Sequence, residues 1–246
     1  MVKVDQNIFF ALDVETANAD YSSICQIGIA KFKKDKLVDK WVALINPETH
    51  FDWMNTEIHG IDKHDVKDCK KFNQLYNEIV SMIENNIVVH HMSFDKVALN
   101  RVCDKYNLPA LNVEWVDSAK IARRTWEQFA YKGYGLGNIS KFLNIEFKHH
   151  DALEDAIASG RIAIHACKKS GMSISEWVNR IKKPIKLNTE KIGKIIGNKN
   201  GGLFGENIVF TGSLFLPRND ISKIAANMGC NVGTSVTKET TILVVG

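Results

Sequence analysis

The sequence lacks any long apolar run and any closely spaced pair of cysteines. No stretch of about eighteen consecutive apolar residues occurs in the chain, so we expect no helix that crosses a membrane. The 5 cysteines never have Cys-x-x-Cys spacing, which predicts reduced thiols rather than disulfides or zinc ligands. The first residues lead directly into an apolar segment at Ile8, and we expect no signal peptide. These absences predict a cytoplasmic protein that does not contact a membrane.

The chain also has little net charge, but that charge is unevenly distributed. Residues 1–170 carry 22 Lys and Arg against 23 Asp and Glu, whereas residues 171–246 carry 10 against 5. The segment 182–200 accounts for the whole excess, because it contains 6 lysines and 1 acid. Such a segment would attract a phosphate backbone in a salt-dependent manner. A solvated linker that its lysines keep soluble would have the same composition.

Two acidic residues stand where the first apolar run ends. Asp13 and Glu15 follow Ile8–Leu12, and because side chains alternate along a strand, both point to the same side. Two carboxylates held together raise a pKa unless a cation lies between them. Oxygen ligands favour Mg²⁺ or Mn²⁺, so the pair predicts a site for a divalent metal. Solvated carboxylates at an exposed strand end would give the same short motif.

A histidine and a further acid flank the start of a long helical pattern. The helix is expected to run to about Lys169, with Asp151 as its N-cap in a capping-box-like start. His150 then lies just outside the helix, and Asp155 lies within its first turns. This arrangement suits a general base on a movable joint and a metal ligand on a rigid element. We expect the competing His149 to be an ordinary exposed histidine.

Asp95 is the fourth acidic candidate. The short buried strand Ile87–His90 and then Phe94 precede it, which places Asp95 at a strand-to-helix crossover where ligands gather in α/β folds. An N-cap role is the alternative for this aspartate. Asp117, by contrast, is expected to be the N-cap of the helix that follows it.

These motifs together resemble those of a known enzyme family. Asp13-x-Glu15-Thr16, the block His90–Asp95 and His150-x4-Asp155 are similar to the three motifs of the DEDDh 3′–5′ exonucleases. In pattern they resemble the proofreading epsilon subunit of bacterial DNA polymerase III. The resemblance covers roughly residues 5–170. It implies a ribonuclease-H-like α/β fold, with a mixed sheet flanked by helices, in the cytosol or nucleoid of a bacterium.

The resemblance also implies an activity in replication proofreading or repair. Nucleoside 5′-monophosphates would be released from DNA 3′ ends that are single-stranded or mismatched, with His150 as the general base. Two divalent cations, Mg²⁺ or Mn²⁺, would assist the hydrolysis. The residues expected to hold them are Asp13, Glu15, Asp95 and Asp155.

Five residues are expected to contact the substrate. The segment Thr56–Ile61 resembles a loop that contacts the terminal base, although a structural turn before a helix is an equal alternative. Two positions depart from the family pattern: Ala17 stands where another Thr or a Gly is common, and His91 replaces a frequent Asn. Neither change affects an expected metal ligand. The expected substrate contacts are Thr16, Ala17, Ile58, His59 and Phe94.

Hydrophobic periodicity predicts the order of elements along the chain. Strands are expected at 8–12, 24–32, 37–45, 87–90 and 113–116, and helices at 72–84, 95–106, 118–130, 136–143, 151–169 and 175–181. We expect an exonuclease domain over 1–172, a short helix with a lysine-rich linker over 173–202, and a small module over 203–246.

The last module resembles the N-terminal part of a BRCT domain. The resemblance rests on Gly205–Gly212, Gly229 and Thr240–Gly246, with strands at 208–210, 231–232 and 241–245 and a helix that starts at Pro217. The rest of the BRCT pattern is absent, so we expect a truncated and marginally ordered α/β module. Its implied role is to bind a replication or repair protein.

Two other functions stay open. The same chemistry on RNA would make a 3′–5′ exoribonuclease that trims RNA ends, because contacts to a 2′-hydroxyl cannot be read from sequence. A non-catalytic BRCT-type adaptor in DNA repair would need the tail but not the acids. The four acids argue against the adaptor, since a like-charge cluster costs stability without a metal.

Overall fold

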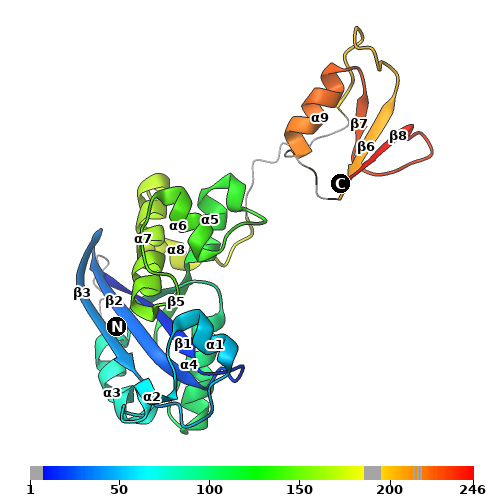
Figure 1. Ribbon diagram of the computed structural model, residues 1–246. Helices are drawn as coiled ribbons and strands as arrows, with labels where there is room; N and C mark the ends of the chain where they lie inside the picture. The colour runs from blue at the N-terminus through cyan, green and yellow to red at the C-terminus, as the bar shows by residue number, and fades with distance from the viewer. Residues whose placement is uncertain (1–7, 186–194, 213, 215, 217) are drawn as a thin grey trace. The chain divides into compact units, whose positions relative to one another are not determined.

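The computed structural model describes residues 8–185, 195–212, 214, 216 and 218–246, and the chain divides into two compact units, Met1–Ile185 and Lys186–Gly246 (Figure 1). Lys186, Lys191 and Lys194 of the lysine-rich segment lie outside the described residues, as does the expected helix start at Pro217. All 5 cysteines are free, as expected. Within the described ranges, no helix combines the length and apolar character needed to cross a membrane.

The first unit is built on a mixed sheet of five strands in the order β3-β2-β1-β4-β5. β1, β2 and β3 form an antiparallel meander, while β4 lies parallel to both β1 and β5. The expected mixed α/β fold is therefore confirmed. The strands are β1 (Ile8–Thr16), β2 (Ile24–Lys33), β3 (Lys36–Leu44), β4 (Ile87–His90) and β5 (Glu114–Asp117).

Helices cover both faces of this sheet, and β1 contributes alternate residues to two separate cores. Phe9 and Ala11 belong to the core shared with α5 (Ser118–Thr125), α6 (Leu136–Leu143), α7 (Ala152–Ser170) and α8 (Ile174–Arg180). Phe10 and Leu12 belong to the core with α3 (Phe72–Ile83) and α4 (Phe94–Lys105) on the opposite face (Figure 1). Asp13 and Glu15 continue the first set, so they point to the face that α7 covers.

The expected helix at 118–130 is shorter in the structure. α5 ends at Thr125, Trp126 has an extended backbone, and a 3₁₀ turn follows at Glu127–Phe129. The ring of Trp126 packs edge-to-face against Phe129 and Phe142, with ring centroids 6.5 and 6.1 Å away. This aromatic packing overrides the helical periodicity of the segment.

The helix α8 belongs to the first unit. Its Ser173 N-cap forms a capping box with Glu176, and Ile174 and Trp177 are buried in the core that α7 shares. The structure accordingly divides the chain after Ile185, later than the expected boundary at residue 172. Burial of Trp177 is the physical reason, because it joins the short helix to the first unit.

In its described residues, the second unit contains a three-stranded parallel sheet in the order β7-β6-β8 and one helix. Its elements are β6 (Asn207–Thr211), α9 (Arg218–Asn227), β7 (Asn231–Gly233) and β8 (Ile242–Val245), close to the expected strands. Ile195 pairs with Val232, and the Asn198 N–H donates to the Ala226 carbonyl. The end of the expected linker is therefore part of this unit.

Candidate active site

The acidic residues of β1 lie where this strand extends beyond its neighbour β4. β1 pairs with β4 at Phe10 and Ala11, and the chain of β4 turns away before it reaches Val14. The Val14 N–H donates instead to Oδ1 of Asp95 at 3.1 Å. Asp95 lies in the first turn of α4 and is buried, while Ser93 is the N-cap of that helix. The alternative N-cap role for Asp95 is thereby excluded, and its carboxylate lies beside β1.

α7 approaches the sheet closely at its N-terminal end. Asp13 pairs with Gly28 on β2, and a Cβ placed on Gly28 would lie 2.3 Å from the backbone nitrogen of Leu153. Gln26 pairs with Glu15, and its Oε1 accepts a hydrogen bond from the Ala152 N–H at 3.0 Å. These contacts hold the first turn of α7 against β2.

This approach brings a third carboxylate to the pair on β1. Ligand oxygens of Asp13, Glu15 and Asp155 all lie within 4.8 Å of one another. Asp151 is the N-cap of α7, as expected, and its side chain accepts from Leu153 and Glu154 N–H. The capped start of α7 fixes the turn that carries Asp155.

Burial and mutual repulsion raise the pKa of each carboxyl in this cluster. Burial is the largest cause for Asp13, whose pKa lies well above its usual range, and the charges of Asp95 and Asp155 raise it further. Burial and then the charge of Asp155 raise the pKa of Glu15 to about 8. Within the described part of the chain, no nearby positive charge offsets the repulsion between these carboxylates when they are ionised.

The other two carboxyls are shifted in the same direction. Burial raises the pKa of Asp95 to about 7, opposed by the hydrogen bond from Val14. Burial also raises the pKa of Asp155 to about 6, opposed by the hydrogen bond from the His150 N–H.

A hard divalent cation fits this set of ligands. Oδ1 of Asp155 is buried and has no hydrogen-bond partner among the residues the structure describes. Three carboxylates at short range with one unpartnered oxygen form the donor set that Mg²⁺ or Mn²⁺ prefers. Such a cation would also relieve the repulsion that raises the pKa values.

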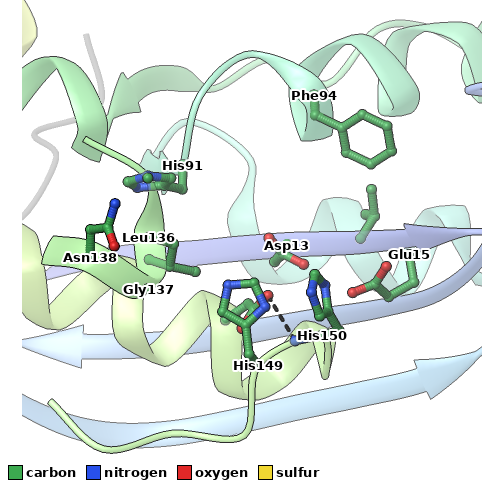
Figure 2. Close-up of a pocket in the computed structure, with 12 residues that line it drawn as sticks. Asp13, Glu15, His91, Phe94, Leu136, Gly137, Asn138, His149 and His150 are labelled. Carbon is green, nitrogen blue, oxygen red and sulfur yellow. Dashed lines mark hydrogen bonds between the residues drawn. The ribbon is translucent and has the colours of Figure 1, made fainter. Parts of the chain in front are cut away.

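His150 lies at the joint before α7. Its backbone has φ +65°, and its N–H donates to Oδ2 of Asp155 at 3.3 Å (Figure 2). Burial lowers the pKa of His150, and the neighbouring His149 lowers it further. The imidazole is therefore neutral near pH 7 and able to accept a proton.

An open cavity of about 480 Å³ is lined by Asp13, Glu15, His150 and Asp155, whereas Asp95 lies outside its lining. Sequence reasoning did not predict that the N-terminus of α6 and His91 line it, or that His149 lines it across from α6 (Figure 2). His149 is exposed, as expected, but it also lines the cavity, and its adjacency to His150 was the available signal. The unforeseen lining residues are His91, Gly135, Leu136, Gly137, Asn138 and His149.

His91, which replaces the Asn frequent in the family, forms hydrogen bonds within the protein. Its ring lies 2.7 Å from Oγ of Ser118 and 3.0 Å from the carbonyl of Tyr134. The side chain thus links the end of β4 to α5 and to the loop before α6. Asp117 is the N-cap of α5, as expected, and also accepts from the Met92 N–H.

The expected substrate contacts are distributed unevenly around the cavity. Phe94 lines it and packs edge-to-face against Tyr21, with centroids 5.0 Å apart. Ile58 is exposed on α1 (Trp53–His59), outside the lining of the cavity. A structural turn is also present, since α1 ends at Gly60 with a left-handed backbone.

The remaining contacts are engaged within the protein. The His59 ring accepts the Ile61 N–H at Nδ1, so Nε2 carries the proton and donates to the Thr16 carbonyl at 3.2 Å. Ala17 is fully buried, and its N–H already donates to Ser23 at 2.8 Å. Thr16 and Ala17 are both buried and neither lines the cavity, and their contact with substrate stays a prediction.

A mixed sheet that gathers carboxylates at the end of its central strand, beside a histidine before a crossing helix, defines a nuclease of the ribonuclease-H-like class. Residues 10–163 match the Exonuclease (RNase_T) family, and the chain belongs to that family. It is accordingly an exonuclease-family hydrolase.

Known proteins similar to this chain include large bacterial polymerases. The chain is 28% identical over 158 residues to a PolC-type DNA polymerase III of Streptococcus pneumoniae, covering 63% of this chain and 11% of that protein. It is 29% identical over 167 residues to the PolC-type DNA polymerase III of Streptococcus mutans, and this match covers 65% of this chain and 11% of that protein. The match therefore spans about a ninth of these relatives.

Solved structures share the fold. Exonuclease X in complex with 5′ overhanging duplex DNA has a TM-score of 0.57 at 21% identity, over 70% of this chain and 99% of that one. The nuclease domain of 3′hExo, a DEDDh family member bound to rAMP, has a TM-score of 0.55 at 16% identity. This match covers 66% of this chain and 92% of that one. At these identities the likeness establishes the fold alone.

Proposed function

We propose that this chain is a metal-dependent 3′–5′ exonuclease that releases nucleoside 5′-monophosphates from DNA. The observation that carries the proposal is the convergence of Asp13, Glu15 and Asp155 within 4.8 Å, with Asp95 alongside. Asp13, Glu15 and Asp155 would hold one cation, and Asp13 with Asp95 would support a second. Two bound divalent cations, Mg²⁺ or Mn²⁺, would acidify the attacking water and neutralise charge on the leaving oxygen.

His150 would move the proton in this reaction. The water oxygen forms a bond to phosphorus while the bond from phosphorus to the 3′ oxygen breaks. A ring nitrogen of His150 takes the proton that the water loses, and the 3′ oxygen gains one from solvent. A positioned base of this kind contributes about 10²–10⁴-fold in rate.

We favour DNA over RNA as the substrate because most of the similar proteins described above act on or bind DNA. The two sequence relatives described above are DNA polymerases, and exonuclease X is solved with a DNA duplex. The bound rAMP of 3′hExo favours RNA as the second candidate. We propose a cytoplasmic role in proofreading or repair, with the BRCT-like module over 203–246 binding a replication or repair protein.

The decisive experiment compares cleavage of three nucleic-acid substrates, each labelled at one end. Single-stranded DNA, a mismatched primer–template and RNA, each labelled at the 5′ or the 3′ end, are offered with Mg²⁺ and then with EDTA. Stepwise shortening of 5′-labelled DNA supports the proposal, and immediate release of 3′-labelled mononucleotide fixes the direction. Faster cleavage of RNA would favour the exoribonuclease.

A catalytic variant distinguishes this enzyme from a contaminant. Asp13→Asn keeps the size of the side chain but removes the charge, and it should abolish the metal-dependent cleavage. Metal-independent binding without cleavage of any substrate would instead favour the adaptor.

A further inference from the structure

A second set of candidate metal ligands overlaps the carboxylate cluster. Ligand atoms of His149, His150 and Asp155 also lie within 4.8 Å of one another. Asp155 is common to both sets, whereas the other members differ in chemistry. One set offers carboxylate oxygens only, and the other offers two imidazoles with one carboxylate.

The two histidines are arranged so that both can point to one atom. Their ring centroids lie 4.0 Å apart with the planes at 76°, and both rings face the cavity (Figure 2). Gly137 of α6 lies beside the His149 ring, and a Cβ there would be in ordinary van der Waals contact with it, 3.7 Å away. Among the described residues, neither ring forms a hydrogen bond that would have to break on binding a metal.

We propose that His149, His150 and Asp155 form a binding site for Zn²⁺ or a similar transition metal, separate in chemistry from the Mg²⁺ site. Two imidazoles and a carboxylate with one open position are a common zinc ligand set. Bonds of about 2.0–2.1 Å at tetrahedral angles place ligand atoms roughly 3.4 Å apart. The three side chains would close by small rotations, because His149 and His150 lie on the joint before α7.

Zinc at this position would oppose the proposed reaction. Asp155 serves both sets and lines the shared cavity, and its buried Oδ1 has no hydrogen-bond partner among the described residues. A zinc ion would occupy the His150 nitrogen that accepts the proton and would draw Asp155 away from Asp13 and Glu15. Zinc would therefore inhibit the Mg²⁺-dependent enzyme, and this consequence rests on the proposed exonuclease function whereas the binding does not.

Zinc binding is measured directly on the metal-stripped full chain. Zn²⁺ is titrated in competition with a chromogenic chelator, and Co²⁺ is added separately to record the visible absorption of a tetrahedral site. His149→Phe keeps a ring of similar size but removes its nitrogens. His165→Phe, at an exposed histidine on α7, is the matched control.

The expected result is a single zinc site in the wild type and in His165→Phe. Binding should be weaker in His149→Phe by at least about 10–100-fold, the cost of losing a residue that merely supports a ligand, because this variant loses a ligand itself. Asp13→Asn should keep its zinc affinity, because Asp13 lies outside the histidine set. Equal zinc binding by His149→Phe and the wild type would overturn the proposal. So would zinc binding that disappears in Asp13→Asn, because the ion would then sit among the carboxylates.

Inhibition is scored separately in nuclease assays with excess Mg²⁺. Zinc should inhibit the wild type at lower concentration than it inhibits His149→Phe, relative to each protein's own rate without zinc. Identical inhibition curves would overturn the inhibitory role. A wild type that binds zinc through His149 but cleaves no nucleic acid would contradict the exonuclease proposal and leave the zinc site standing.

Discussion

Asp13 faces Gly28 across the β1–β2 ladder, and the missing side chain of Gly28 is what admits the backbone of α7. The nearest α7 atoms would lie 2.3 to 2.5 Å from a Cβ at this position. The helix therefore rests directly on the strand beside the acidic pair, and Asp155 reaches Asp13. The geometry of the cluster therefore depends on Gly28, which has no side chain and no functional group of its own.

Replacing Gly28 should damage both stability and the cluster. In Gly28→Ala the added methyl meets the backbone of Ala152 and Leu153, which cannot rotate away. We expect a decrease of about 1–3 kcal/mol in the free energy of unfolding and weaker Mn²⁺ binding. Denaturant unfolding and metal titration measure the two effects.

Gly137→Ala is the matched control for that variant. Its Cβ would meet only the His149 ring at 3.7 Å, and alanine favours the helix by up to about 1 kcal/mol. Unchanged stability in Gly28→Ala would show that α7 shifts freely and that close packing does not fix Asp155.

The metal-free protein should lose stability as the pH rises. Glu15 has a pKa of about 8 in the folded protein against an ordinary value of 4.5, so between these values the folded state retains a proton that the unfolded chain has released. Stability is full below pH 4.5, falls through this window and levels off above pH 8.

Unfolding in EDTA across this pH range tests the sign of the effect. Glu15→Gln should reduce the slope, and saturating Mg²⁺ should reverse the decrease because a cation stabilises the ionised carboxylates. Stability that increases with pH in EDTA would contradict the raised pKa values.

Removing the imidazole of His150 should slow catalysis without abolishing metal binding. We expect His150→Ala to lower kcat by about 10²–10⁴-fold while Mn²⁺ affinity at the carboxylates changes little. Single-turnover cleavage and metal titration separate the two properties. A variant with full activity would show that another group takes the proton.

The lysines of segment 182–200 should contribute to nucleic-acid affinity. Deletion would disturb the second unit, since Ile195 and Asn198 bond within it, so substitution by glutamine is the better test. Replacing the lysines should weaken single-stranded DNA binding and flatten its salt dependence by about 0.7 for each phosphate that is no longer neutralised. Unchanged affinity and slope would assign them to solubility. The lysines to replace are Lys182, Lys183, Lys186, Lys191, Lys194 and Lys199.

Local patterns in the sequence were sufficient to predict most elements of the first unit. Alternation along β1 put Asp13 and Glu15 on one side, and the Asp151 and Asp117 N-caps were predicted from residue type and position. The helix expected to reach residue 130 ends at Thr125, because Trp126 packs against Phe142 of α6. Hydrophobic periodicity within one segment cannot predict a contact with another segment.

The sequence by itself determined which residue types the site would use, because strand alternation and helix capping act over a few residues. Only the tertiary structure decided that Asp155 meets Asp13 and Glu15 within 4.8 Å. That convergence depends on the approach of α7 to Gly28, a contact between positions 125 residues apart that only the packed sheet brings about. The place of His149 in the cavity was decided in the same way, since the wall facing it comes from α6.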